Sequence, residues 1–455
     1  MKIDEFKKLI EEKIHRNKEI KLIKEIADEL KIPLYLVGGF LRDAILSREN
    51  VDLDFIVNGE PDKISKKVAE RLRAKLIIMD KQDIINYRIV KRGMSVDFAE
   101  VFQADIHKDL ARRDFTINSI AYSLSEKKLY DDFDGIGDLE KGIIKMVSDD
   151  TFDNDPLRML RAVRYFTTLE GFYIEKKTLS LIALKKDLIS RASPERIKEE
   201  MDKIILSGNP VRGMVLLIEI KILETLFFKS NSTMQIKPVN TQEEKGKLIA
   251  VLKIINELIG KTLFDGSQMI ELKYSPDDLK IIYYAAIVSF LWSSFFKTEI
   301  EIKDIVSILK NMRFSNIEIS RICRVIDGLK YFFELSETKE LETDVRRLIH
   351  KTGRDVLILM VLGNAILRAL GKENYKQTVI IRTNILRIFN KDGDSIINPK
   401  KLIDGKDIIR ILKCEEGERV GKIIKEIKKL QIENKISTRR EAMELVEVID
   451  SNLLD

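Results

Sequence analysis

The hydrophobic pattern of the chain changes near residue 150. Before that point, short runs rich in β-branched and aromatic residues predict strands at 34–37, 51–57, 74–79, 86–90 and 95–101. Residues 61–74 have apolar positions at helical spacing and a proline in the first turn, which is typical of a helix start. After Asp150, apolar residues recur every three to four positions. The pattern predicts a mixed α/β domain followed by a long helical array.

Composition adds to this picture. With 34% charged and 44% hydrophobic residues, the 455-residue chain has the make-up of a soluble globular protein, with room for about two to four domains. The 8 prolines and 21 glycines are about half the usual share, which favours a mostly helical chain. A net charge of +6 fits a polyanionic partner, and it fits equally a solvated surface rich in Lys and Glu.

Cysteine and histidine usage limits the chemistry. Cys323 and Cys414 cannot build a disulfide framework or a thiolate zinc site, and the three histidines are scattered along the chain. A metal here would therefore be held by oxygen ligands, which points to magnesium. The N-terminal segment is an amphipathic charged helix without an apolar secretion signal, and no apolar run reaches membrane-spanning length. We expect a cytoplasmic protein without a membrane segment.

The first candidate site follows the strand at 34–37. That strand leads into Gly38 and Gly39, where missing Cβ atoms let backbone N–H groups approach phosphate oxygens. Arg42, one turn further on, can add a charge-assisted hydrogen bond. A tight strand–helix turn would also explain the two glycines by themselves.

A pair of carboxylates strengthens the phosphate interpretation. Asp52 and Asp54 are two residues apart on a strand, so both side chains project from the same face and repel each other unless a cation lies between them. Magnesium accepts this geometry and shares its ligand shell with substrate phosphates. In the alternative, Asp52 caps a turn and only Asp54 is exposed. Asp97, on another strand, is either a third carboxylate of the site or a group that supports the first two, or else a surface residue at a strand end.

Two further segments carry arginines. Arg112 and Arg113 suit a triphosphate, because guanidinium groups bind phosphate bidentately, and Asn118 could hydrogen-bond a sugar hydroxyl. The alternative is a solvated charge run, although the apolar residues around Asn118 place the segment against a core.

The next segment predicts a nucleotide-reading helix. Asp155 is expected to be the N-cap and Pro156 the first helical residue. The side chains that share one face and suit nucleotide bases and phosphates are Arg158, Arg161 and Arg164. The residues expected to enter the core from the opposite face are Met159, Ala162, Val163 and Phe166. A salt-bridged surface helix, with Asp155 acting only as a cap, is the alternative.

These segments resemble class II tRNA nucleotidyltransferases and their bacterial poly(A) polymerase relatives. The resemblance rests on LYLVGGFLRD with DLD, DLARRDFTINSIAY, DPLRMLRAVRYF and SPERIKEE, which follow in family order through residues 34–200. The segments IDGKDIIRILKCEEGERVGKIIKEI and STRREAMELV also resemble the end of these enzymes. The resemblance implies an α+β, polymerase-β-like nucleotidyltransferase head followed by an all-helical neck, body and tail. We expect the head at 1–150, the neck at 151–230, the body at 231–345 and a tRNA-binding tail at 346–455.

The resemblance also implies residue roles. Asp52 and Asp54 would be the catalytic carboxylates that hold Mg²⁺. Contacts to the nucleoside triphosphate would come from Gly38, Gly39, Arg42 and Arg113. Asp155 and Arg158 would form a protein template for the incoming base, supported by Arg161 and Arg164. The implied reaction is attack of a tRNA 3′-hydroxyl on the α-phosphate of CTP or ATP, with two metal ions assisting and pyrophosphate leaving. The partner would be a tRNA lacking its 3′ CCA end, bound by a monomer or a homodimer.

Two departures from the family pattern bear on specificity. Asn154 stands where family members commonly carry Glu, so one carboxylate that supports the template is missing. The connection at 100–108 is short, whereas CCA-adding members have a longer flexible loop there, and a shortened loop is characteristic of members that add only two cytidines. No HD-type metal motif is present, so we expect no appended phosphohydrolase.

The sequence therefore predicts template-independent addition of C to tRNA 3′ ends, and it favours CC addition over complete CCA addition. Poly(A) polymerase or A-adding activity is the nearest alternative. A small-molecule nucleotidyltransferase would not need the long helical half. A non-catalytic RNA-binding scaffold is opposed by the intact Asp52, Asp54 and Arg113.

Overall fold

The computed structural model of the chain describes residues 3–81, 84–91, 93–228, 242–259, 262–264, 269–271, 273–296, 301–335, 337–371 and 375–452. The chain forms two compact units, Met1–Leu226 and Phe227–Asp455, and each is described by itself. The expected neck–body boundary after residue 230 lies within 229–241, outside the described residues.

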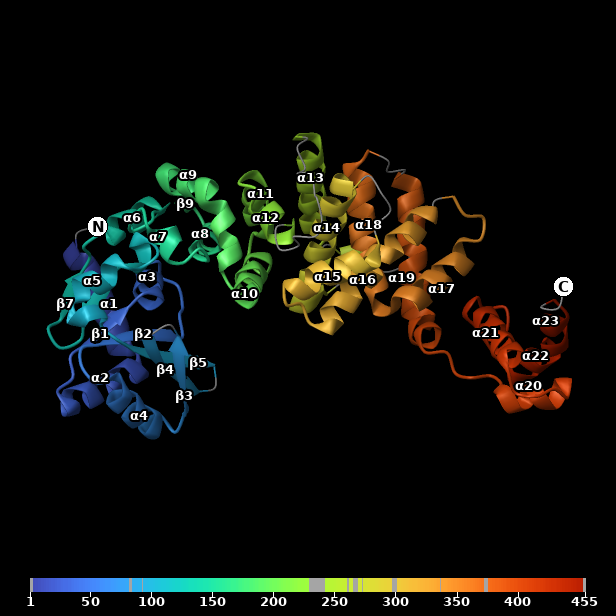
Figure 1. Cartoon of the computed structure of the whole chain (residues 1–455), viewed down its shortest axis with the longest axis horizontal. Helices are drawn as coiled ribbons and strands as arrows, with labels where there is room; N and C mark the ends of the chain where they lie inside the picture. Colours follow the sequence, from blue (N-terminus) through green and yellow to red (C-terminus); the bar gives the residue numbers. More distant parts are fainter. Residues whose placement is uncertain are drawn as a thin grey trace. The chain divides into compact units, whose positions relative to one another are not determined.

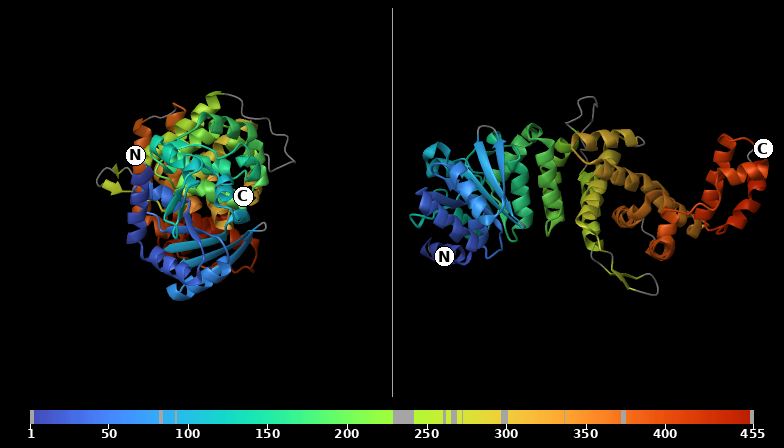
Figure 2. Two further views of the ribbon diagram at one scale, coloured as in Figure 1. Left: turned by 90° about the vertical axis from the view of Figure 1, so that its left-hand side faces the viewer. Right: turned by 90° about the horizontal axis from the view of Figure 1, so that it is seen from below.

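The first unit is built on a seven-stranded sheet (Figures 1 and 2). The strand order is β3-β4-β5-β2-β1-β6-β7, and only the β2–β5 pair is parallel. The strands are β1 (Leu34–Val37), β2 (Asp52–Val57), β3 (Lys75–Lys81), β4 (Ile84–Lys91), β5 (Met94–Glu100), β6 (Ala121–Ser123) and β7 (Lys128–Tyr130). The first five were predicted from the sequence. Strands β6 and β7 were missed, because three residues are too few to show an alternating pattern.

Helices surround this sheet. Those of the head are α1 (Ile3–Arg16), α2 (Lys18–Leu30), α3 (Gly39–Ile45), α4 (Pro61–Leu72), α5 (Ile106–Ala111), α6 (Gly135–Lys141) and α7 (Thr151–Asn154). Helix α4 packs on β3, β4 and β5. On one face of the sheet, a buried cluster joins α5 to the central strands through Val37, Ile56, Val101, Ile106 and Leu110. Asp54 and Ile56 are two residues apart on β2, so their side chains project from the same face of the sheet. The cluster therefore lies on the face that carries the carboxylates.

Five further helices follow in the chain, namely α8 (Arg158–Thr168), α9 (Lys176–Lys185), α10 (Pro194–Ile205), α11 (Pro210–Glu219) and α12 (Ile222–Phe228). The predicted core face of α8 is confirmed for Met159, Ala162 and Val163, which are fully buried, whereas Phe166 is half-buried beneath the Arg212 guanidinium, 3.7 Å from the ring centroid. Helix α11 approaches α8 closely at Gly213, where a Cβ would lie 2.4 Å from the Thr167 methyl carbon.

The second unit is mostly helical. Its helices are α13 (Gln242–Leu258), α14 (Pro276–Phe296), α15 (Ile302–Asn311), α16 (Asn316–Glu334), α17 (Leu341–Thr352), α18 (Val356–Ala369), α19 (Tyr375–Ile397), α20 (Gly405–Leu412), α21 (Glu418–Ile432), α22 (Arg439–Glu444) and α23 (Val446–Asn452). Helices α16 and α18 approach at Gly363, where a Cβ would lie 2.4 Å from the Phe332 ring. The last four helices share a core of their own, in which Ile408, Ile423 and Val446 are fully buried.

The α+β head followed by a mostly helical remainder confirms the predicted fold class. The remainder is not entirely helical. Strand β9 (Tyr173–Ile174), between α8 and α9, pairs in parallel with β8 (Ile143–Ile144) of the head, and β10 (Thr262–Phe264) pairs antiparallel with β11 (Met269–Glu271). The β8–β9 pair satisfies backbone groups of both segments, and segments of two residues carry no periodic signal in the sequence. Among the described helices, none is both long and apolar enough to cross a membrane.

Candidate active site

The turn between β1 and α3 brings several of the predicted site residues together. Gly38 has φ +72° and ψ −134°, a backbone conformation that glycine adopts without steric cost. A Cβ at Gly38 would lie 3.4 Å from Asp54 Oδ2 and 3.5 Å from Arg113 Nη1. In the sheet, Val37 is the partner of Asp54, so the end of β1 lies beside the carboxylate. A bare backbone, a carboxylate and a guanidinium therefore meet at one point.

Three carboxylates lie on adjacent strands at this point. Asp54 on β2 is the register partner of Asp97 on β5, and burial together with the neighbouring Asp97 charge raises the pKa of Asp54. Asp52 is exposed and accepts a hydrogen bond from the Ser95 hydroxyl at 2.6 Å. No described residue donates a hydrogen bond to the Asp54 carboxylate. The Asp52–Asp54 pair thus has the surplus negative charge and oxygen donors that suit a divalent cation.

Asp97 has a defined partner. Arg88, its neighbour on β4, donates from Nε and Nη2 to the two Asp97 oxygens at 2.7 and 2.6 Å. Within the described residues, no group of three His, Cys, Asp or Glu side chains is arranged to hold a metal ion. A cation at Asp52 and Asp54 would therefore complete its shell with substrate or water oxygens, as magnesium does.

Arg42 and Asn118 form a buried network behind the glycines. Arg42 donates from Nε and Nη2 to the Asp43 carboxylate at 2.9 and 2.8 Å, and from Nη1 to Asn118 Oδ1 at 2.8 Å. Asn118 donates to Asp114 Oδ1 at 3.0 Å. The amide of Asn118 thus links two segments of the head through protein contacts. The predicted contact of Asn118 with a sugar hydroxyl stays a prediction.

Arg113 is the more accessible of the arginines near the glycines. Its Nε and Nη2 atoms donate to Asp109 Oδ2 at 3.3 and 3.2 Å, and its side chain keeps 22% exposure. Its neighbour Arg112 lies over the ring of Phe102, 4.5 Å from the centroid. Its Nη1 donates to the Asn118 carbonyl at 3.4 Å, a long hydrogen bond. Asp109 and Asn118 therefore orient Arg113, and its partly exposed guanidinium can still reach a ligand.

Each arginine of α8 has its own anchor. Arg158 donates to the backbone carbonyls of Arg112 at 2.7 Å and Arg113 at 3.3 Å. Arg161 pairs with the buried Asp114 at 2.7 Å. Arg164 donates to Glu200 on α10 at 2.6 Å. The arginine face is thus tied to residues 112–114 and to α10, and two of its three arginines are in ion pairs, as the salt-bridged alternative also expects.

Tyr165, which the sequence did not single out, lies among these arginines. The guanidinium of Arg42 is 5.0 Å from its ring centroid and that of Arg164 is 4.3 Å away, while Arg161 donates to its hydroxyl at 3.2 Å. Burial raises the pKa of Tyr165, but the surrounding arginines, Arg161 first, lower it overall. The side chain of Tyr165 thus contacts all three guanidinium groups. Its only sequence signal was its place one residue after Arg164.

The prediction for the start of the reading helix was wrong by two residues. Helix α8 begins at Arg158, and Asp155 has an extended backbone at the end of α7. Asp155 Oδ1 accepts from the Leu157 backbone N–H at 3.1 Å, an Asx-type turn, and Oδ2 accepts from Arg196 at 2.8 Å. The side chain closes a local turn instead of capping the helix. Arg196 and Glu200, both in the SPERIKEE segment, were not assigned these roles from the sequence.

The short connection after β5 is folded against the head. Val101 and Ile106 are buried at its two ends. Gln103 and Ala104 between them have φ of +52° and +55°, a left-handed conformation that permits a tight turn. The Phe102 backbone N–H donates to Asp109 at 3.4 Å. The connection is therefore anchored by buried residues at both ends.

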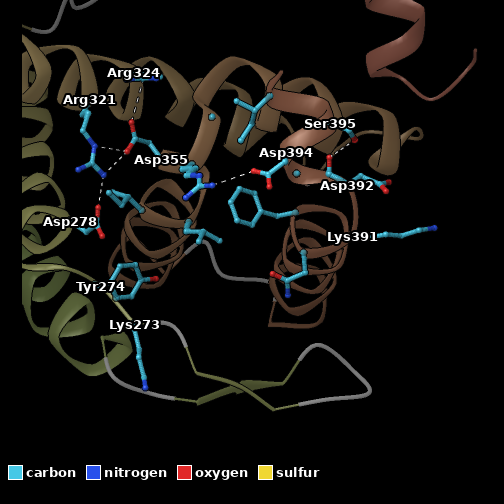
Figure 3. Close-up of a pocket in the computed structure, with 18 of the residues that line it drawn as sticks. Lys273, Tyr274, Asp278, Arg321, Arg324, Asp355, Lys391, Asp392, Asp394 and Ser395 are labelled. Carbon is cyan, nitrogen blue, oxygen red and sulfur yellow. Dashed lines mark hydrogen bonds and ion pairs between the residues drawn. The ribbon is translucent and has the colours of Figure 1, made fainter. Parts of the chain in front are cut away.

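A cavity of about 1100 Å³ lies elsewhere, in the second unit (Figure 3). Arg321 bridges Asp278 at 2.5 Å and Asp355 at 2.7 Å across its wall, and Arg354 lies 3.3 Å from Asp394. Its charged groups thus largely neutralise each other. None of the predicted site residues lines it.

Comparisons with known proteins agree with this site. Residues 34–145 match the model of the poly A polymerase head domain, and residues 171–230 match a probable RNA- and SrmB-binding site of polymerase A. Residues 289–446 match a domain described as tRNA nucleotidyltransferase domain 2, putative.

Relatives extend the agreement over most of the chain. A CC-adding tRNA nucleotidyltransferase of Synechocystis sp. is 29% identical over 412 residues, which cover 90% of this chain and 91% of the relative. A CCA-adding enzyme of Lactococcus lactis is 26% identical over 433 residues, 90% of each chain. In fold, the chain is similar to a CCA-adding enzyme solved with CTP, with a TM-score of 0.67, 22% identity and 97% of each chain covered. Enzymes of this kind use a divalent metal. The chain belongs to the class II tRNA nucleotidyltransferase family.

Proposed function

We propose that this protein adds nucleotides to the 3′ end of tRNA that lacks its CCA terminus, using CTP and, in the complete CCA form of the reaction, ATP. The observation that carries the proposal is the meeting of Asp54, Gly38 and Arg113 at the end of β1. Carboxylates for a cation, a bare backbone for phosphates and a guanidinium for phosphates are the parts that nucleotidyl transfer needs. The relatives named for CC and CCA addition match about nine-tenths of the chain.

Asp52 and Asp54 would hold Mg²⁺ in this reaction. When bound, the cation makes the tRNA 3′-hydroxyl more acidic and offsets charge on the departing pyrophosphate. The Ser95 hydroxyl keeps Asp52 in place through its hydrogen bond. Arg88 neutralises Asp97, which limits the total negative charge beside Asp54.

The remaining residues would bind and orient the nucleotide. Gly38 and Gly39 offer backbone N–H groups, and Arg113, oriented by Asp109, offers a guanidinium to the triphosphate. Arg42, in the middle of α3, would contact the triphosphate, and its hydrogen bonds to Asp43 and Asn118 fix its guanidinium.

Base selection would come from Asp155 and Arg158. Arg196 orients the Asp155 carboxylate, and two backbone carbonyls orient Arg158, so both groups present fixed hydrogen-bonding edges. Arg161 and Arg164 support them through Asp114 and Glu200.

We infer that the two-cytidine product accumulates. Adding A after CC requires the same pocket to accept a larger base, whose edge presents different hydrogen-bond donors and acceptors. The connection at 100–108 is held at both ends, and Phe102 packs on Arg112, whose carbonyl in turn holds Arg158. This chain of contacts favours a single orientation of Arg158, which supports selection of one base.

The four regions would divide the work. Residues 1–150 carry the chemistry, 151–230 read the nucleotide, and the body at 231–345 and tail at 346–455 hold the tRNA. The separate core of α20–α23 makes the last part of this tail a module of its own. A tRNA substrate also favours the cytoplasmic location expected from the sequence.

The test is product length on defined RNA ends. Purified enzyme is incubated with tRNA lacking CCA and each single NTP, and separately with tRNA ending in CC and ATP. Two cytidines added from CTP, with little A added to the CC end, is the expected result. Rapid addition of one A would establish complete CCA addition, processive A addition would favour a poly(A) polymerase, and no addition at all would refute the proposal.

A further inference from the structure

A second cavity, which lies in the first unit, has a volume of about 600 Å³, typical of small-ligand sites. Its walls come from α1, the first turns of α2 and the β6–β7 hairpin, which lie in the blue and cyan parts of Figure 1. Helices α1 and α2 precede the segment that matches the head-domain model, which begins at residue 34. This cavity is therefore formed largely by elements outside the matched catalytic segment.

The cavity lies on the face of the sheet opposite the carboxylates. In the sheet, Tyr122 pairs with Leu36, whereas Asp54 pairs with Val37. Successive side chains of a strand point to opposite faces, so Tyr122 points away from the face that carries Asp54. Tyr122 lines the cavity, and its hydroxyl donates to Glu11 on α1 at 2.8 Å. The cavity is thus separate from the candidate active site.

The cavity wall has a surplus of positive charge. Its cationic side chains, apart from His15, are Lys8, Arg16, Lys21, Lys24 and Lys127. They face two carboxylates, Glu11 and Glu12, and Glu11 already accepts the Tyr122 hydrogen bond.

Most of these cations have no partner. Lys24 pairs with Asp28 at 2.9 Å. In the part of the chain that the structure describes, Lys8, Arg16, Lys21 and Lys127 make no side-chain hydrogen bond or ion pair. Elsewhere in the head, comparable surface lysines are paired, as Lys66 is with Asp62 at 2.9 Å. Four unpaired cations around one cavity repel each other, and a bound anion would remove that repulsion.

We propose that this cavity binds a polyphosphate anion, meaning two or more linked phosphate groups. A terminal phosphate monoester carries roughly −1.5 to −2 charges at neutral pH, so four unpaired cations match more than one phosphate. The Tyr122–Glu11 hydrogen bond fixes α1 against the sheet and keeps the cationic side chains around a defined space. The same chemistry is offered by a free di- or triphosphate and by an RNA backbone. The inference does not depend on the function proposed for the active site.

The test compares two charge-reversal variants of the full chain. Lys21→Glu/Lys127→Glu removes two cations of the cavity, and Lys91→Glu/Lys176→Glu makes the same change in net charge at exposed lysines outside it. Binding of inorganic tripolyphosphate is measured by calorimetry at low salt, in an Arg113→Ala background that weakens binding at the active site. We expect the cavity variant to lose at least about tenfold in affinity and the control less than about twofold, since each lost contact is charge-assisted. Equal affinities in the two variants would overturn the proposal.

A second measurement identifies the source of the phosphates. If the cavity binds RNA backbone, the cavity variant also lowers tRNA affinity and reduces the slope of log affinity against log salt by about one to two. If tRNA binding is unchanged while tripolyphosphate binding is lost, the ligand is a free polyphosphate. Should charge reversal unfold the protein, Lys21→Gln/Lys127→Gln replaces it, and wild-type tripolyphosphate affinity in that folded variant refutes the site.

Discussion

Replacing Phe102 with alanine should weaken base selection without touching the nucleotide site directly. The ring of Phe102 lies under the Arg112 guanidinium at 4.5 Å, and the Arg112 carbonyl accepts a hydrogen bond from Arg158 at 2.7 Å. Phe102 is 39% exposed, so the cation–π contact contributes about 0.5–1 kcal/mol, the range for exposed sites. If that energy holds Arg158 in its reading orientation, its loss lowers discrimination by about two- to fivefold.

The assay measures kcat/KM for CTP and for ATP on tRNA lacking CCA and on tRNA ending in CC. In Phe102→Ala, the ratio of CTP to ATP kcat/KM should fall by that factor, because Arg158 gains freedom to accept a different edge. Tyr173→Ala is the matched control, since Tyr173 is an aromatic residue of the same unit with 51% exposure and lies outside the site. An unchanged ratio, or equal losses for both nucleotides, would refute the idea that the connection acts through Arg112.

Four further predictions follow from the site. Asp54→Ala should lower nucleotide addition by about a thousandfold, since it removes charge stabilisation from the transition state, while tRNA binding in a filter assay stays unchanged. Arg113→Ala should raise KM for all four NTPs alike, because it contacts phosphates, whereas Asp155→Asn should alter their ranking; single-nucleotide kinetics separates the two. Asp114→Asn should lower the free energy of unfolding, measured in urea, by about 3 kcal/mol. This is the low end of the range for breaking a buried ion pair, because the Arg161 side chain is 35% exposed. Burial raises the pKa of Asp114, but Arg161 and Asn118 lower it overall, so its pKa is lower in the folded protein than in the unfolded chain. The stabilisation is therefore complete above the unfolded-chain pKa of about 4 and is lost as the pH falls through the pKa of the folded protein. Below about pH 5, the free energy of unfolding of Asp114→Asn should vary less with pH than that of the wild type.

The sequence predicted the parts of the head that local patterns determine. Strands of four or more residues, the same-face placement of Asp52 and Asp54, and the buried face of α8 each follow from the spacing of neighbouring residues. Strands β6 and β7 have only three residues each, too few for an alternating hydrophobic pattern to be recognised.

The contacts that orient the site could not be predicted in this way. Arg42 and Asn118 are 76 residues apart, and Arg196 reaches Asp155 across 41 residues. Such pairs depend on how helices and strands pack, and a single sequence carries no local signal for them. The start of α8 was misplaced for a related reason, because Asp155 satisfies a nearby turn and a distant arginine instead of the helix.

The position of β1 has a consequence for synthesis on the ribosome. This strand pairs with β2 on one side and with β6 on the other, so one of its edges stays open until residues 121–123 have emerged. An apolar strand with an open edge can pair with another nascent chain. Arg42 likewise has no Asn118 to bind until the same stretch leaves the exit tunnel. A pause in translation between residues 60 and 120 should therefore leave the nascent chain prone to aggregation, and a chaperone that covers β1 during that interval would protect it.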